Sequence, residues 1–180
     1  MLDNTEDILE KFAKRVIQQS RTRLTKGKMN VNKSLYNSLK YKLDTTPSSF
    51  IIHFLMNEYG SYVDRGVKGT KSNYVENKKT PFSYKPSSNL IGLEAATGIF
   101  GKWAKKKRFR LRDPKGKYAK GTYKSIGFII AQSIKKKGIR ATHFFTRSFE
   151  QAYEKLPKEI IEAYKLDLEE FISSSTYQTK

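Results

Sequence analysis

The segment between residues 127 and 156 constrains the fold of this chain most, because two helical patterns meet within it. In the first pattern, apolar residues recur at helical spacing as far as Ile134, and three lysines occupy positions 135–137. Lysines complement the negative end of the helix dipole, and a glycine can adopt the left-handed conformation that ends a helix. The pattern therefore predicts a helix that ends at Gly138.

The second pattern follows after a short link. Thr142 is a suitable N-cap, and Phe145, Phe149, Tyr153 and Leu156 recur at helical spacing behind it. We therefore expect a second helix that begins after Thr142. Neither pattern contains residues whose type and spacing indicate catalysis.

The N-terminal part of the chain also has a helical pattern. Asn4 or Thr5 can cap a helix that runs through about Leu24, and Gly27 is expected to end it. Its apolar stripe, which begins at Ile8, is typical of a helix that packs against the rest of a fold.

An alternating pattern follows and predicts a β-hairpin. Apolar and polar residues alternate over residues 39–43, a turn-rich stretch spans residues 44–49, and residues 50–56 are apolar on both faces. A strand that is apolar on both faces must be covered on both. We expect a helix to cover one face of the second strand, and another subunit could cover the other.

The middle of the chain is more irregular. Residues 59–66 predict a short helical turn, and residues 70–89 predict a long polar loop. Residues 90–107 regain a helical pattern that glycines interrupt, and Trp103 is expected to anchor this part to the core.

The end of the chain returns to a helical pattern. Pro157 suits the first turn of a last helix, whose apolar residues extend to Ile172. Together the patterns predict an α+β fold, with a small antiparallel sheet packed with a long N-terminal helix and C-terminal helices, and a basic insertion at about 90–137. We expect residues 1–172 to form a single domain and residues 173–180 to form a flexible tail.

Charge is distributed unevenly along the chain. The formal net charge is +19, of which residues 102–140 carry +14, whereas residues 150–170 carry −4. Such asymmetry indicates a basic face that meets nucleic acid or an acidic protein, and an acidic face that could meet the basic face of a neighbouring copy. Alternatively, the lysine-rich loops only keep a small domain soluble.

The densest basic stretch, residues 105–124, also contains aromatic residues. Lys and Arg supply phosphate contacts, and Phe109, Tyr118 and Tyr123 could stack on bases. Arginines alternate with apolar residues, which predicts a strand, and residues 113–116 suit a hairpin turn. The sequence has no zinc-finger spacing, helix-turn-helix pattern or RNA-binding octamer, so it predicts sequence-blind contact with DNA at most. The candidate polyanion-binding residues are Lys105, Lys106, Lys107, Arg108, Arg110, Arg112, Lys135, Lys136 and Lys137.

Two segments resemble the bacteriophage tail-completion, or head–tail joining, proteins. YGSYVDRGVKG, residues 59–69, is similar to that family's aromatic-x-x-aromatic-Val-acid-x-Gly segment, which follows a β-hairpin. GIRATHFFTRSFEQAY, residues 138–153, is similar to its closing Phe-rich segment. The chain differs from the family by the large addition at residues 90–137, and by His143-Phe144 in place of the usual Pro-Phe.

The resemblance implies a structural virion protein of the phage neck. Such a protein forms a homo-oligomeric ring, of roughly six or twelve copies, between portal and tail around the DNA channel. The implied partners are the portal or adaptor protein and other neck or tail ring proteins, with non-specific contact to packaged DNA and no membrane. The implied location is the virion, and the host cytoplasm during assembly. The candidate subunit-interface residues are Tyr59, Tyr62, Arg65, Phe144 and Phe145.

Two other classes of function remain open. A basic nucleic-acid-binding protein without sequence preference would show the same charge pattern. A metal-dependent nuclease could use Asp64 with Glu76 and Lys78, but the Glu-x-Lys lies in a Pro- and Ser-rich stretch with no strand pattern before it. The chain has no Cys, and its only histidines, His53 and His143, have no acids that we can place beside them. We therefore expect no catalytic residues, no cofactor and no metal.

Overall fold

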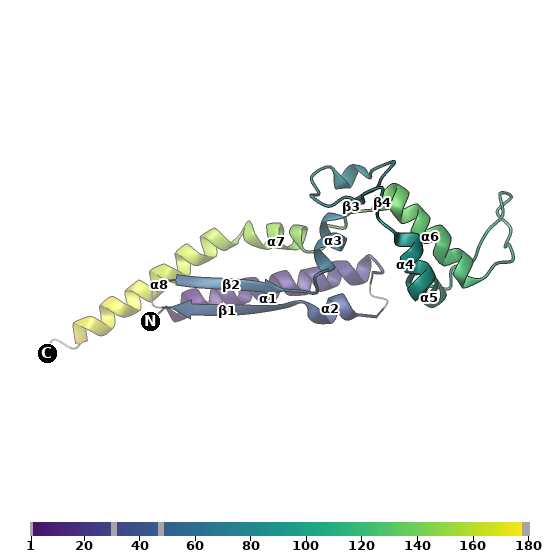
Figure 1. Ribbon diagram of the computed structural model, residues 1–180. Coiled ribbons are helices and arrows are strands. Elements are labelled where there is room, and N and C mark those ends of the chain that lie inside the picture. Colours follow the sequence, from purple (N-terminus) through teal and green to yellow (C-terminus); the bar gives the residue numbers. More distant parts are fainter. Residues whose placement is uncertain (1, 30–31, 47–48, 178–180) are drawn as a thin grey trace. The chain divides into compact units, whose positions relative to one another are not determined.

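A computed structural model describes residues 2–29, 32–46 and 49–177 of the chain (Figure 1). The architecture is α+β, as the sequence predicts, and contains helices and two antiparallel sheets of two strands each. The long N-terminal helix and the C-terminal helices are both present.

The chain divides into two compact units. Residues 1–57 and 143–180 form one, which we call the hairpin unit, and residues 58–142 form the other, which we call the basic unit. The basic unit thus begins before the predicted insertion at about 90–137. The prediction of a single domain over residues 1–172 stays a prediction.

The hairpin unit is built around its first helix. α1 contacts both strands of the hairpin as well as the two C-terminal helices (Figure 1). The elements of this unit are α1 (Asp3–Lys26), α2 (Ser34–Ser38), β1 (Lys40–Thr46), β2 (Ser49–Leu55), α7 (Thr146–Tyr153) and α8 (Leu156–Tyr177).

α1 corresponds to the predicted N-terminal helix and ends at Gly27 as predicted, where the Gly27 N–H donates to the carbonyl of Arg23 at 2.8 Å. The predicted cap is wrong, because Asn4 and Thr5 lie inside the helix. Their backbone N–H groups donate to the carboxylate of Asp167 on α8, at 2.9 and 3.0 Å. The helix is therefore capped by a residue far away in sequence, which fills the role that the N-cap side chain normally has.

Aromatic side chains form much of the core of the hairpin unit. The ring of Phe12 on α1 lies 6.2 Å from that of Phe54 on β2 and 5.6 Å from that of Phe149 on α7, measured between centroids. Phe145 adds a further edge-on contact with Phe54 at 5.4 Å. Such contacts contribute about 0.5–1.5 kcal/mol each beyond area burial. Of the aromatic residues at the predicted helical spacing, Phe149 on α7 joins this core, whereas Phe145 precedes the helix and Tyr153 is 52% exposed.

The start of that helix differs from the prediction. α7 begins at Thr146, and Thr142 does not cap it. The Thr142 N–H instead donates to the carbonyl oxygens of Val63 and Asp64, each at 3.2 Å. The Thr142 hydroxyl donates to the carbonyl oxygen of Val63 at 2.8 Å. Helical spacing alone does not distinguish a capping threonine from one that bonds a distant segment.

The predicted β-hairpin is confirmed, with Lys40 of β1 opposite Leu55 of β2. Ile52 and Phe54 contact the core, whereas Ile51 and Leu55 on the other face are 49% and 52% exposed. A helix thus covers one face of β2, as predicted, and the other face is exposed in the single chain.

The basic unit contains the predicted helix that ends at Gly138, a residue with a left-handed φ of 84°. Just beside this end, β4 pairs with β3, with Val67 opposite Ile139. The elements of this unit are α3 (Gly60–Arg65), β3 (Val67–Lys68), the 3-10 helix η1 (Val75–Asn77), α4 (Leu90–Thr97), α5 (Ile99–Lys106), α6 (Tyr123–Lys137) and β4 (Gly138–Ile139).

A buried amide orders the predicted loop at residues 70–89. The side chain of Asn77 is fully buried, and its NH₂ group donates to the carbonyls of Val67 at 3.0 Å and Ile139 at 2.8 Å. Its amide oxygen accepts from the N–H of Ala141 at 2.8 Å. One side chain therefore joins the loop to both strands of the small sheet.

A buried carboxylate performs a similar task among the helices. Glu94 on α4 is 2% exposed and accepts from the N–H groups of Phe100 at 2.7 Å and Gly101 at 3.0 Å, which are free at the start of α5. Gly127 on α6 lies so close to this carboxylate that a Cβ there would collide with it. Trp103 is 38% exposed, so the prediction that it anchors this part to the core is wrong.

α8 is longer than the sequence predicts. Pro157 lies in its first turn, as predicted, and the helix continues to Tyr177, into the segment predicted as a flexible tail. Residues 178–180 lie outside the described residues. None of the helices in the described part of the chain has the length and apolar character that a membrane span requires.

Candidate functional site

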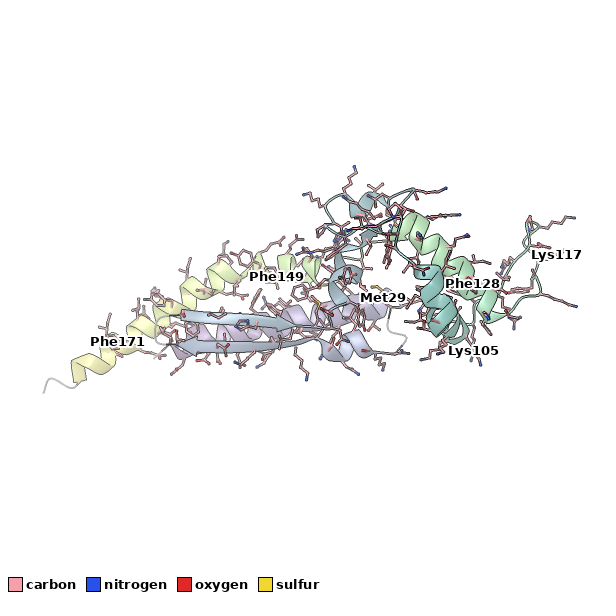
Figure 2. All side chains as sticks on the ribbon, viewed as in Figure 1. Met29, Lys105, Lys117, Phe128, Phe149 and Phe171 are labelled. Carbon is pink, nitrogen blue, oxygen red and sulfur yellow. The ribbon has the colours of Figure 1, made fainter. Side chains whose placement is uncertain are left out.

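Most of the predicted polyanion-binding residues lie in or beside the loop between α5 and α6, residues 107–122, which we call the basic loop. It contains seven Lys or Arg residues and a single Asp. Figure 2 shows Lys105 at the end of α5 and Lys117 on the loop itself. The predicted cations whose side chains are exposed here are Lys105, Lys106, Arg108, Arg110 and Arg112, and Lys107 is half-buried.

The basic loop contains the predicted turn but not the predicted strand. The Asp113 carboxylate accepts from the N–H of Lys117 at 2.8 Å, and Gly116 supplies the left-handed φ of 80°. Beyond the turn, the only ladder contact in the described loop is a bridge between Arg112 and Tyr118. Two strands without a third, or a helix to cover them, are marginal in water, which explains why the alternating pattern does not produce a strand.

Tyr118 lies beside two guanidinium groups. The guanidinium carbon of Arg112 is 4.8 Å from the centre of the Tyr118 ring, and that of Arg110 is 5.4 Å from it. The ring remains 65% exposed. Such a group can stack on a nucleobase while the arginines contact the flanking phosphates.

A cavity of about 560 Å³ lies between the basic loop and the start of α6. Phe109, Leu111, Tyr123 and Ile126 supply its apolar lining. The ring of Phe109 also contacts that of Trp103, 5.1 Å away. A volume of this size is within the range of pockets that hold small ligands, about 300–1,000 Å³. The surface therefore combines phosphate-binding cations with aromatic rings and a recess.

The structure does not bring all predicted cations together. Residues 135–137 lie at the C-terminal end of α6, where the carbonyls of Lys135 and Lys136 accept from the N–H groups of residues 70–72. The start of α6, at Tyr123, borders the cavity of the basic loop. The basic stretch is thus divided into two clusters at opposite ends of one helix.

The predicted interface residues differ in their exposure to solvent. Tyr59 and Tyr62 are each 44% exposed, and Arg65 is exposed beside them. Phe144 has no exposed surface and therefore belongs to the core rather than to a subunit contact, and Phe145 is half-buried within the aromatic cluster. The resemblance named both phenylalanines, but it did not show which of the two side chains faces inward.

The residues of the nuclease alternative are not arranged as a metal site. Asp64 is 3% exposed, whereas Glu76 forms an ion pair with Arg140. The Nε2 atom of His53 lies 3.4 Å from a carboxylate oxygen of Asp44. A hydrogen bond from Lys42 lowers the pKa of Asp44. Among the described residues, no group of three or more His, Asp or Glu could hold a metal ion.

A second recess, in the hairpin unit, was not predicted. It lies between the second half of α1, α2 and the start of β1, and its lining includes Lys14, Arg21, Lys26 and Lys40. Three of these cations are spaced along α1 and Lys40 begins β1, so no continuous basic stretch marks them. A polar stripe at Lys14, Gln18 and Arg21 along α1 was the available indication.

No protein-family model, no curated protein and no solved structure matches this chain.

Proposed function

We propose that this chain is a structural, non-catalytic subunit of the bacteriophage neck, a tail-completion or head–tail connector protein. It forms an oligomeric ring around the DNA channel, in the virion, and is produced in the host cytoplasm during assembly. The observation that supports this is the contact, within the basic unit, between residues 59–69 and residues 138–142, the start of the second segment that carries the resemblance. Val67 pairs with Ile139, and the carbonyl of Val63 accepts from Thr142. Two stretches that resemble one family separately thus meet within the basic unit.

The exposed apolar surfaces suit a protein that assembles. Tyr59, which precedes α3, and Tyr62, on α3, are exposed, and Ile51 and Leu55 are exposed on the hairpin. In the proposed ring, such surfaces meet neighbouring copies, the portal or adaptor protein, or other neck and tail ring proteins. No cofactor takes part.

The basic loop has one of two roles in this proposal. It either faces the DNA in the channel or binds an acidic neighbouring protein. The arrangement of Arg110, Tyr118 and Arg112 favours DNA, because an acidic protein surface would not require an exposed aromatic ring beside the guanidinium groups. The same arrangement supports the second candidate function, which is nucleic-acid binding without sequence preference.

Disruption of the coding sequence in the source phage tests the proposal. We expect DNA-filled heads and free tails that fail to join, and we expect purified protein added to the extract to restore tailed particles. A mutant phage that still makes normal tailed, infectious particles would contradict the neck assignment.

A further inference from the structure

The groove in the hairpin unit has the features of a binding site for a helix. It encloses about 800 Å³ between α1, α2 and β1. Ile17 and Leu39, which are 7% and 1% exposed, supply apolar lining, and Tyr36 and Tyr41 also border it. An amphipathic helix binds such a groove through its apolar face.

The groove is positively charged. Lys14, Arg21, Lys26 and Lys40 line it, and no carboxylate is among its described lining residues. Lys14 forms an ion pair with Glu10 on the same helix, outside the lining. Arg21 donates to the carbonyls of residues 36 and 39 at 3.2 and 2.9 Å, so it is held in place by groups that do not neutralise its charge. The fitting occupant is an acidic helix with an apolar face.

α8 of the same protein has this chemistry. Ile161, Tyr164 and Leu168 recur at helical spacing and are 69%, 48% and 41% exposed, although Ile and Leu are among the residue types that are most often buried. Glu162 and Glu169 lie on the exposed part of the same helix. Figure 2 shows Phe171 farther along α8, where it is 48% exposed.

The groove and this face of α8 do not meet within one chain. α8 runs antiparallel to α1, since Glu159 pairs with Arg15 and Asp167 bonds Asn4. The exposed face of α8 therefore extends toward the start of α1, whereas the groove occupies its second half. No α8 residue lines the groove in the described chain. Any contact between the two surfaces must be between copies.

We propose that α8 of one copy binds in the groove of a second copy through Ile161, Tyr164 and Leu168. Glu162 and Glu169 face the lysines of the groove in this complex. The contact joins two different surfaces, so each copy offers one of each, and repetition closes a ring when the rotation allows it. This inference rests on the proposed ring and identifies its subunit contact.

Two variants, each with one surface removed, test it. Ile161→Glu/Leu168→Glu removes the helix face, and Lys26→Glu/Lys40→Glu reverses charge in the groove. All four residues are exposed, so the fold should tolerate the changes. Leu166→Glu is the matched control, because Leu166 is 50% exposed on α8 but lies away from the apolar face.

Sedimentation equilibrium at concentrations up to the millimolar range is the measurement. We expect wild-type protein and Leu166→Glu to self-associate, and each surface variant to weaken association by more than about a hundredfold. An equimolar mixture of the two variants should form a one-to-one dimer and nothing larger, because it contains only one intact groove and one intact helix face per pair.

Three results would overturn the inference. They are a wild-type protein that stays monomeric, a groove variant that associates as wild type does, and a mixture that forms no dimer. Loss of DNA binding in the groove variant of a monomeric protein would assign the groove to nucleic acid instead. None of these results affects the tail-joining experiment, so a failed contact and a failed neck assignment are distinguishable.

Discussion

At the scale of single residues, Asp167 has the clearest structural role. It is 3% exposed and accepts from Asn4 and Thr5, including the Thr5 hydroxyl at 2.6 Å. Burial alone would raise the pKa of Asp167, but the hydrogen bonds from Thr5 and Asn4 outweigh it and lower the pKa below its ordinary value. The charged carboxylate therefore holds the start of α1 against α8.

Substitution of Asp167 by Asn should destabilise the hairpin unit by about 2 kcal/mol, because charged hydrogen bonds to a helix N-terminus are lost. A lowered pKa in the folded state means that the stabilisation is present above about pH 4 and is lost as the pH falls through the folded pKa. Denaturant unfolding of both proteins between pH 7 and pH 2 measures this.

The matched control is Glu169→Gln on the same helix, whose partner Lys165 is 3.7 Å away on the exposed surface. It should change stability by less than about 1 kcal/mol. If Asp167→Asn and wild type showed the same stability at pH 7 and the same acid sensitivity, the capping role would be refuted.

At the scale of elements, periodicity predicted much of the fold. The spacing of apolar residues indicated α1, the hairpin and α8, and Gly27 and Gly138 end helices where expected. Periodicity reports which face of an element is apolar, but it does not report what the element meets. The groove beside α1 and the burial of Phe144 depend on those contacts and were therefore missed.

Buried polar side chains were beyond sequence reasoning for the same reason. Asn77 lies in a stretch without periodicity, and one of its acceptors, the Ile139 carbonyl, is 62 residues away in sequence. Asp167 looks like one more acid on the polar face of a helix. Both side chains have their hydrogen-bonding roles because of tertiary contacts. In the sequence, each is only a polar residue of a type that is common on protein surfaces.

If the basic loop binds DNA, substitutions in the loop should weaken the affinity of the protein for DNA. Arg110→Gln/Arg112→Gln/Tyr118→Ala removes two phosphate contacts and one stacking surface, so affinity for DNA should fall more than about tenfold and the salt slope should decrease by about 2. Fluorescence anisotropy with a labelled oligonucleotide across a salt series measures both quantities.

Lys135→Gln/Lys136→Gln/Lys137→Gln is the control, because these residues lie at the other end of α6 and the variant removes more charge. It should weaken binding less than the loop variant does. Equal or greater weakening by the control would show that net charge alone governs binding and that the loop geometry has no special role.

At the level of the whole molecule, the proposed contact would join copies of the chain through two unlike surfaces. The hairpin unit carries a cationic groove and an acidic apolar helix, and the basic unit carries the cations that DNA would meet. In a closed ring, every groove and every helix face would be occupied. A ring position would also explain why apolar side chains such as Ile161 are exposed in the single chain.

Cryo-electron microscopy of intact particles from the source would test the proposed neck position. We expect density for this chain as a closed ring between portal and tail, with the channel at its centre. The same map would show whether the basic loop faces the DNA. Particles whose portal-to-tail region is fully accounted for by other proteins, with this chain absent, would contradict the neck assignment and leave the nucleic-acid-binding alternative in its place.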